Sequence, residues 1–347
     1  PNSLTDISIQ ARKPSRGCLN TWPADMLQTS LSDYLARTAG EVALADLIER
    51  IASACWSVSK LIQSSAFDGH QGSTNVVNPQ GEVQKPLDIL ADDVFRRSCC
   101  ANTNLSALIS EEVEEITWLR PAQAGAFILA YDPLDGSSNL DVDLSVGSIF
   151  AVSKLRDDSA IDVLPNGRDL LCSGYAIYGP STMLVLTFGD HVDGFTLDGS
   201  TDSFVLTHPN MTVPQQACEF AINVSRQRHW DRAIQSYVGD CLKGCIGPRQ
   251  KAFNMRWTAS MVADVHRILV RGGVFLYPVD ADNAAAGGKL RLLYEAMPMA
   301  MIVETAGGGA TDGRIPLLDV VGTTPHQRTS VILGAREEID LIRAAYS

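Results

Sequence analysis

Apolar positions at two different spacings run along the chain, and they predict where helices and strands lie. One series recurs every three or four residues, at Leu44, Leu47, Ile48, Ile51, Cys55, Val58 and Ile62. This spacing puts the apolar side chains on one face, so it predicts an amphipathic helix. Thr38-Ala39-Gly40-Glu41 precedes the series and has the form of a capping box, which predicts that the helix begins there. Residues 1–30 show no clean periodicity, and we expect a poorly ordered N-terminal arm.

Short continuous apolar runs predict strands. Phe127–Tyr131 is one, and Ala107–Ile109 is another. From residue 149 to 206 five further runs alternate with turns that contain Gly-Pro or Asp-Gly, which predicts an antiparallel meander. Later stretches predict a strand at 220–223, a helix at 261–269 and a strand at 274–278. Helices and strands therefore mix along the whole chain, as in α/β or layered α+β proteins.

The length of 347 residues suits one or two domains with sizeable cores. His208-Pro209-Asn210 follows the last strand of the meander and reads as a connection between domains. We therefore expect a first domain over residues 31–210 and a second over residues 211–347.

The most informative stretch is Asp132-Pro133-Leu134-Asp135-Gly136-Ser137-Ser138-Asn139, directly after the strand at 127–131. Pro133 stiffens a turn that brings Asp135 back beside Asp132. Gly136 permits a close approach of backbone to a ligand, and the N–H groups and hydroxyls after it suit a phosphate. Carboxylates next to a phosphate repel it unless a cation lies between, and Mg²⁺ or Mn²⁺ prefers such oxygen ligands. The alternative is an ordinary turn, because Asp-Pro and Asp-Gly are common turn dipeptides.

Other polar residues stand where elements end. Glu111 and Glu112 follow the strand at 107–109, whereas the next acidic pair, Glu114 and Glu115, is expected to face solvent. Lys289 and Arg291 are cations suited to phosphate. Glu295 comes just before Pro298, a favourable first helical position, so we place it near a helix start.

The composition limits the partners. A net charge of −12 argues against nucleic acid, but a few local cations still permit an anionic substrate. The chain contains no run of 18 apolar residues that would suggest a membrane span, and no secretion signal at its start. We expect a cytoplasmic protein; because the chain begins with Pro1, an upstream organelle-targeting segment that has been removed stays open. The eight cysteines have no zinc-like spacing and are expected to be free thiols.

Tyr131–Asn139, followed by Ser145-Val146-Gly147-Ser148-Ile149-Phe150, resembles the signature of class I fructose-1,6-bisphosphatases, a family of lithium-sensitive, metal-dependent sugar phosphatases. The similarity runs from about Thr38 to Tyr346 and includes several motifs in the same order. It implies a sandwich of alternating helix and sheet layers. It also implies hydrolysis of the 1-phosphate of fructose 1,6-bisphosphate to fructose 6-phosphate and phosphate, in gluconeogenesis or the Calvin cycle.

The resemblance implies roles for individual residues. Roughly two to three Mg²⁺ or Mn²⁺ ions per subunit would be held by Glu111, Glu112, Asp132, the Leu134 carbonyl, Asp135 and Glu295. Asp88 and Glu112 would orient or deprotonate the attacking water, with Asp88 brought in on a mobile loop over residues 75–90. Substrate would be bound by Asp135, Gly136, Ser137, Ser138, Asn223, Trp257, Tyr277, Lys289 and Arg291, and by Arg256 from a neighbouring subunit. The protein would then be a homo-oligomer, a dimer or a tetramer.

Departures from the family pattern keep alternatives open. Val224-Ser225-Arg226 stands where relatives have Glu-Gly-Tyr, so Arg226 could replace the tyrosine contact, and Trp257 replaces another tyrosine. These changes keep sedoheptulose-1,7-bisphosphatase activity, alone or in addition, as the alternative function. A metal-free glycosidase with paired carboxylates and a non-enzymatic anion-binding role are the alternatives from other classes.

Overall fold

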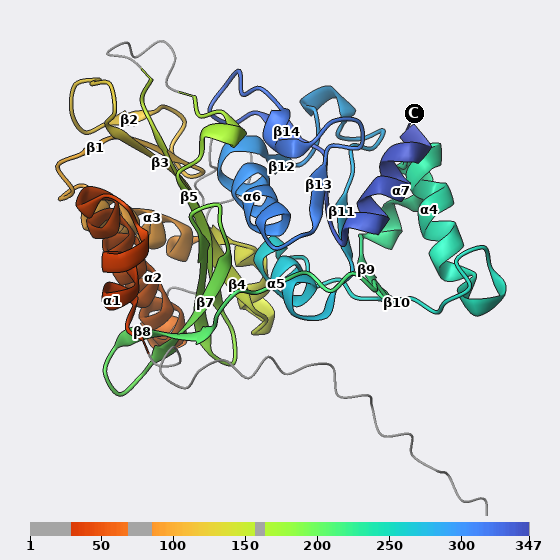
Figure 1. Ribbon diagram of the computed structural model, residues 1–347, viewed down its shortest axis with the longest axis horizontal. Helices are drawn as coiled ribbons and strands as arrows, with labels where there is room; N and C mark the ends of the chain where they lie inside the picture. Colours follow the sequence, from red (N-terminus) through yellow and green to blue (C-terminus); the bar gives the residue numbers. More distant parts are fainter. Residues whose placement is uncertain (1–28, 69–84, 157–163, 347) are drawn as a thin grey trace, which may run out of the picture.

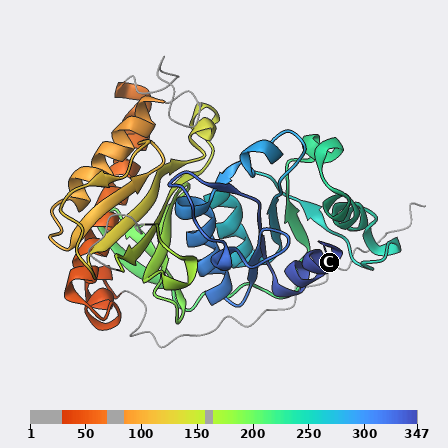
Figure 2. The same ribbon diagram turned by 90° about the horizontal axis from the view of Figure 1, so that it is seen from above.

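Helices and sheets alternate in five layers across the molecule (Figures 1 and 2). The computed structural model describes residues 29–68, 85–156 and 164–346. Helices α1 (Leu31–Thr38), α2 (Val42–Asp68) and α3 (Pro86–Cys99) cover the outer face of the first sheet. Helices α5 (Met261–Arg271) and α6 (Met297–Thr305) lie between the two larger sheets. Helices α4 (Arg232–Leu242) and α7 (Arg336–Tyr346) cover the far side. The predicted layered sandwich is confirmed.

The first sheet has eight strands in the order β2-β1-β3-β4-β5-β6-β7-β8. Its strands are β1 (Leu105–Ser110), β2 (Thr117–Trp118), β3 (Phe127–Asp135), β4 (Val146–Lys154), β5 (Cys172–Tyr178), β6 (Thr182–Thr187), β7 (Val192–Asp198) and β8 (Ser203–His208). From β3 onward each strand pairs antiparallel with the next, so the predicted meander is confirmed. Strands β1 and β3 instead run parallel, and their carboxyl ends therefore lie side by side.

The second sheet has five strands in the order β10-β9-β11-β15-β13, and a small two-stranded sheet pairs β12 with β14. Their bounds are β9 (Glu219–Ala221), β10 (Asn254–Met255), β11 (Val274–Tyr277), β12 (Leu290–Arg291), β13 (Gly309–Thr311), β14 (Arg328–Thr329) and β15 (Val331–Gly334). All of these strands follow residue 210, and all strands of the first sheet precede it. The division into domains at residue 210 stays a prediction. The apolar core between the two sheets contains residues from both halves of the chain.

The apolar run in β3 is continuous because both faces of this strand are buried. Phe127, Leu129 and Tyr131 pack against α1–α3, whereas Ile128 and Ala130 point into the core between the sheets. A strand with both faces buried carries apolar residues at every position rather than at alternate ones. Among the described residues, the helices include none that combines the length and the apolar character needed to cross a bilayer.

The predicted start of the first long helix is wrong. Thr38 does not cap α2; it ends the shorter helix α1, and its hydroxyl donates to the carbonyl oxygen of Tyr34. Glu41 does not reach back to a helix amide, because its carboxylate is paired with Lys154. Between the two helices Gly40 has a φ of +71°, a conformation that interrupts a helix and that glycine adopts readily. The chain therefore forms two helices where one capping box was expected.

Candidate active site

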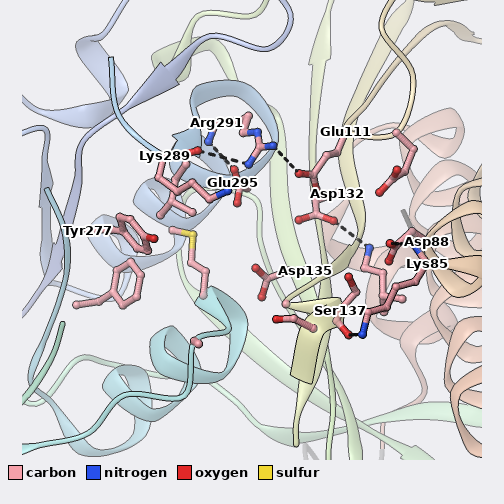
Figure 3. A pocket seen from close by; sticks show the side chains of 18 of the residues that line it. Lys85, Asp88, Glu111, Asp132, Asp135, Ser137, Tyr277, Lys289, Arg291 and Glu295 are labelled. Atoms are coloured by element: carbon pink, nitrogen blue, oxygen red, sulfur yellow. Dashed lines mark hydrogen bonds and ion pairs between the residues drawn. The ribbon is translucent and has the colours of Figure 1, made fainter. Parts of the chain in front are cut away.

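A β-bulge at the end of β3 brings the two aspartates to the same side. Asp132 lies opposite Ile149, and Asp135 lies opposite Gly147, so three steps along β3 match two along β4. In a regular strand, side chains three apart point to opposite faces, and one additional residue cancels that alternation. Figure 3 shows the side chains of Asp132 and Asp135 both directed into one cavity.

Backbone and helix contacts fix these aspartates. The amide of Leu134 donates to Asp132 Oδ1 at 2.9 Å. Asp135 Oδ2 accepts hydrogen bonds from the hydroxyl of Ser260 at 2.7 Å and from the amide of Val262 at 2.9 Å, so it lies at the N-terminus of α5. Gly136 has a φ of +73°, and a Cβ there would come within 2.7 Å of Ser260 Cβ. Glycine is therefore required for the close approach of the turn to α5.

The two glutamates reach the cavity because of the parallel pairing of β1 and β3. Ser110 lies opposite Tyr131, so Glu111 is next to Asp132 at the strand ends. The amide of Glu112 donates a hydrogen bond to Ser110 Oγ at 3.2 Å. Both glutamates line the cavity, whereas Glu114 and Glu115 are exposed, as predicted.

Glu295 comes from the second half of the chain and lies near the start of α6, as predicted. It belongs to a π-helical turn, η7 (Leu292–Ala296), that runs directly into α6. Pro298, in the first turn of α6, cannot donate to a preceding carbonyl, and the wider turn before it accommodates that loss. The carboxylate of Glu295 accepts a hydrogen bond from the amide of Arg291.

Three buried carboxylates converge in the cavity. Oxygen atoms of Asp132, Asp135 and Glu295 all lie within 4.8 Å of one another. Burial, followed by the charges of Glu111 and Asp135, raises the pKa of Asp132 well above its usual range. Burial likewise raises the pKa of Asp135 to about 6 and that of Glu295 to about 8, although Arg291 opposes the shift at Glu295. Buried negative charges at this spacing repel one another unless a cation lies among them. An all-oxygen donor set of this kind fits a hard divalent cation.

Asp88 lies in the first turn of α3, and its Oδ2 accepts a hydrogen bond from the amide of Lys85 at 2.8 Å. Its other oxygen, Oδ1, is buried without a hydrogen-bond partner among the described residues. Burial raises the pKa of Asp88 to about 6. The expected loop that carries Asp88 lies largely outside the described residues, and Asp88 itself belongs to a helix.

Cations and aromatic rings form the rest of the cavity. Arg291 Nη2 lies 3.2 Å from Glu111 Oε1, which links the two halves of the chain (Figure 3). Lys289, Ser137 and Ser138 also line the cavity. Trp257 stacks on Phe275 with ring centroids 6.0 Å apart, and the ring centroid of Tyr277 lies 5.8 Å from that of Trp257. These aromatic rings form one wall of the cavity.

Two predicted substrate residues do not line the cavity. Asn223 caps a short 3-10 helix by accepting a hydrogen bond from the amide of Ser225, and Arg256 is exposed. Their roles stay predictions. The guanidinium of Arg226 pairs with Asp280 at 2.8 Å and with Asp282 at 2.9 Å, and its role in place of the tyrosine contact also stays a prediction.

Lys85 is a cavity residue to which the sequence analysis assigned no role. Its ammonium group donates to the carbonyl oxygen of Ser137 at 3.0 Å and pairs with Asp141 at 2.7 Å. It therefore holds the turn after Gly136 against the start of α3. The only sequence signal was its place three residues before Asp88, directly ahead of Pro86 at the helix start.

The fold and cavity together define a layered α/β protein in which buried carboxylates and basic side chains share one site. Residues 29–209 match the model of the fructose-1,6-bisphosphatase N-terminal domain, and residues 213–347 match that of the C-terminal domain. The chain belongs to the fructose-1,6-bisphosphatase family.

Individual relatives agree with this assignment. The chain is 46% identical over 323 residues to a class 1 fructose-1,6-bisphosphatase of Methylobacillus flagellatus, covering 91% of this chain and 97% of the relative. Its fold is similar to the holo form of Leishmania major fructose-1,6-bisphosphatase, with a TM-score of 0.86, 36% identity, and coverage of 92% of this chain and 99% of that one. The apo form of the same Leishmania major enzyme matches with a TM-score of 0.80 and 34% identity over the same shares.

Proposed function

We propose that this protein is a phosphatase that hydrolyses the 1-phosphate of fructose 1,6-bisphosphate to fructose 6-phosphate and phosphate. The observation that carries the proposal is the cavity: carboxylates from three distant parts of the chain face Lys289 and Arg291, in a protein of this family. The comparisons do not favour the sedoheptulose-1,7-bisphosphatase alternative, because the matched domains and relatives carry the fructose name.

The carboxylate cluster supports dependence on a divalent cation, which the family also implies. In our proposal Mg²⁺ or Mn²⁺, roughly two to three ions per subunit, is held by Glu111, Glu112, Asp132, the Leu134 carbonyl, Asp135 and Glu295. Such ions, when bound, neutralise phosphate charge and lower the pKa of a water molecule. Without a cation the buried carboxylates would repel the substrate phosphate.

Asp88 and Glu112 are our proposed groups for the attacking water. Both line the cavity, and Asp88 Oδ1 is buried without a protein hydrogen-bond partner among the described residues, so it can accept a proton or a hydrogen bond from water. The amide of Lys85 holds the other oxygen of Asp88 and thereby fixes the orientation of the carboxyl group.

Arg291, Ser137, Ser138 and the backbone at Asp135 and Gly136 are proposed to hold the reacting phosphate. A guanidinium can bind two phosphate oxygens at once, and it stays charged throughout the reaction. At the opposite end, Lys289, Tyr277 and Trp257 are proposed to bind the sugar and its second phosphate, with help from Asn223. The exposed Arg256 is proposed to reach the site of a neighbouring subunit in a homo-oligomer, a dimer or a tetramer.

The experiment that tests this function measures phosphate release from fructose 1,6-bisphosphate and from sedoheptulose 1,7-bisphosphate, with Mg²⁺ and with a chelator. We expect Mg²⁺-dependent release with preference for the fructose substrate. Equal activity in chelator would refute the metal-dependent mechanism, and faster release from the sedoheptulose substrate would reverse the assignment of substrate.

A further inference from the structure

The connection between β1 and β2, residues 111–116, carries Glu111 and Glu112, two of the proposed metal ligands. Its first residues are held by the first half of the chain, since the amide of Glu111 donates to the carbonyl oxygen of Tyr131 at 3.2 Å. Polar contacts also reach the connection from the second half. Arg291 pairs with Glu111, and Nε2 of His326 lies 3.0 Å from the carbonyl oxygen of Glu114.

His326 links this connection to the π-helical turn that carries Glu295. Its Nδ1 lies 2.8 Å from the hydroxyl of Tyr294, a fully buried residue next to Glu295. A carbonyl oxygen can only accept a hydrogen bond, so Nε2 carries the hydrogen. In that neutral tautomer Nδ1 accepts from the tyrosine O–H, and both hydrogen bonds are satisfied at once. The two rings also meet edge to face, with centroids 5.9 Å apart.

We propose that Tyr294 and His326 are a positioning pair that sets the affinity of the site for divalent cations. Neither residue lines the cavity, as the described residues define it, so the pair acts through the groups that it holds. Tyr294 orients the imidazole, and the imidazole fixes the 111–116 connection relative to the turn that bears Glu295. Glutamates from two halves of the chain can share an ion only if their separation is maintained, and partners behind the ligands commonly provide that. This inference rests on the proposed function, because it concerns the same site.

Three substitutions of His326 separate the two hydrogen bonds. H326Q retains a donor at the position of Nε2, H326N retains an acceptor near Nδ1 but loses that donor, and H326A loses both. The first measurement is the binding of Mn²⁺ to the metal-free protein. The electron paramagnetic resonance signal of free Mn²⁺ reports how much of the ion stays unbound. We expect H326A and H326N to bind Mn²⁺ about tenfold more weakly than wild type, and H326Q to stay within about threefold.

Phosphate release against Mn²⁺ concentration provides a second measurement. If the pair has a positioning role, H326A needs a higher Mn²⁺ concentration to reach half of its maximal rate, which is the activation midpoint. Saturating Mn²⁺ then restores the rate, and KM for fructose 1,6-bisphosphate stays within about twofold of wild type. A purely structural role would instead lower the rate at every Mn²⁺ concentration and leave the midpoint unchanged. That second result would overturn the proposal.

His191→Ala is the matched control. His191 also contacts a tyrosine hydroxyl, that of Tyr34 at 3.4 Å, and lies 3.0 Å from Asp193, but it joins α1 to β7 away from the cavity. We expect H191A to bind Mn²⁺ as wild type does. Wild-type affinity in H326A, equal losses in H326Q and H326A, or an equal shift in H191A would each overturn the proposal. Absence of phosphate release by the wild-type protein would instead refute the proposed function. The Mn²⁺ affinities would still test whether Tyr294 and His326 position the metal ligands.

Discussion

Asp132 and Asp135 share one side of β3 because the strand contains an additional residue between them. Their carboxylates come within 4.8 Å of Glu295, although nothing in a regular strand would place them on one face. Each of these groups is buried, and burial raises each pKa. At the residue scale, the site is therefore a cluster of buried acids whose ionised forms a bound cation would stabilise.

Asp132→Asn and Glu111→Gln test this charge directly. Each substitution keeps the shape of the side chain and removes one negative ligand, so we expect turnover to fall by about a hundredfold or more. The circular dichroism spectrum should be unchanged. In the absence of metal, Asp132→Asn should be as stable as wild type or more stable because repulsion falls, whereas Glu111→Gln also removes the ion pair with the buried Arg291 and should not gain stability. Turnover like that of wild type in both variants would remove the proposed metal site.

Gly136→Ala should reduce both stability and activity. Its φ of +73° disfavours alanine, and the new Cβ would meet Ser260 Cβ at 2.7 Å. We expect a loss of about 1–3 kcal/mol in the free energy of unfolding by urea, together with a large loss of turnover.

Gly40→Ala is the control for that substitution. Gly40 has nearly the same φ, +71°, but no atom within 4 Å of an added Cβ. We expect G40A to lose about 1 kcal/mol and to retain turnover. If both variants lose the same stability and the same turnover, contact with Ser260 is not the reason for glycine at residue 136.

At the scale of elements, α5 links the site to the core. Its N-terminus holds Asp135 through Ser260 and Val262, and its body lies between the two sheets. On the side toward the first sheet, Nδ1 of His266 lies 2.9 Å from the hydroxyl of Tyr175 on β5. Burial, assisted by the charge of His208, lowers the pKa of His266 to about 4.

This lowered pKa predicts acid sensitivity in a defined window. An unfolded histidine titrates near pH 6.5, so between about pH 6.5 and pH 4 the unfolded chain binds more protons than the folded one. Stability should therefore fall as the pH falls through this range, by up to about 1.4 kcal/mol per pH unit from this one group. Urea midpoints of wild type and His266→Gln at pH 7, 6 and 5 measure the effect. The variant should show a flatter dependence on pH, and parallel curves would assign the acid sensitivity to other groups.

At the scale of the whole molecule, both halves of the chain build one cavity and one core. Glu111, Asp132 and Asp135 come from the first half, and Arg291 and Glu295 come from the second. The core between the two sheets also contains residues of both halves. Separate halves would expose this apolar surface and would lose the carboxylate cluster.

The proposed oligomer predicts complementation between two defective variants. Arg256→Ala should raise KM about tenfold or more, because a charge-assisted contact to phosphate is lost, while kcat changes little. Asp132→Asn should lack turnover but still present Arg256 to a neighbour. Mixed oligomers of the two variants should regain a wild-type KM on the subunits with an intact metal site. No recovery after verified subunit exchange would place Arg256 in its own subunit's site or outside any site.

Much of the fold could be predicted because local pattern and tertiary structure agree. The meander, α5 and the buried strand at 127–131 follow from spacing of apolar residues, which reflects burial. The prediction of a capping box failed because a long-range contact overrules the local signal. Glu41 fits a capping box by position, but Lys154 from β4 binds its carboxylate.

The sequence alone determined the layered α/β class, the membership in a family of sugar phosphatases, and most of the residue types at the site, because apolar periodicity and short polar motifs are local properties of a chain. Only the tertiary structure decided which acids converge, that Lys85 belongs with them, and that His326 ties two distant segments together. Those relations depend on a bulge, a parallel strand pair and a π-helical turn, and such features arise from packing between segments far apart in the chain.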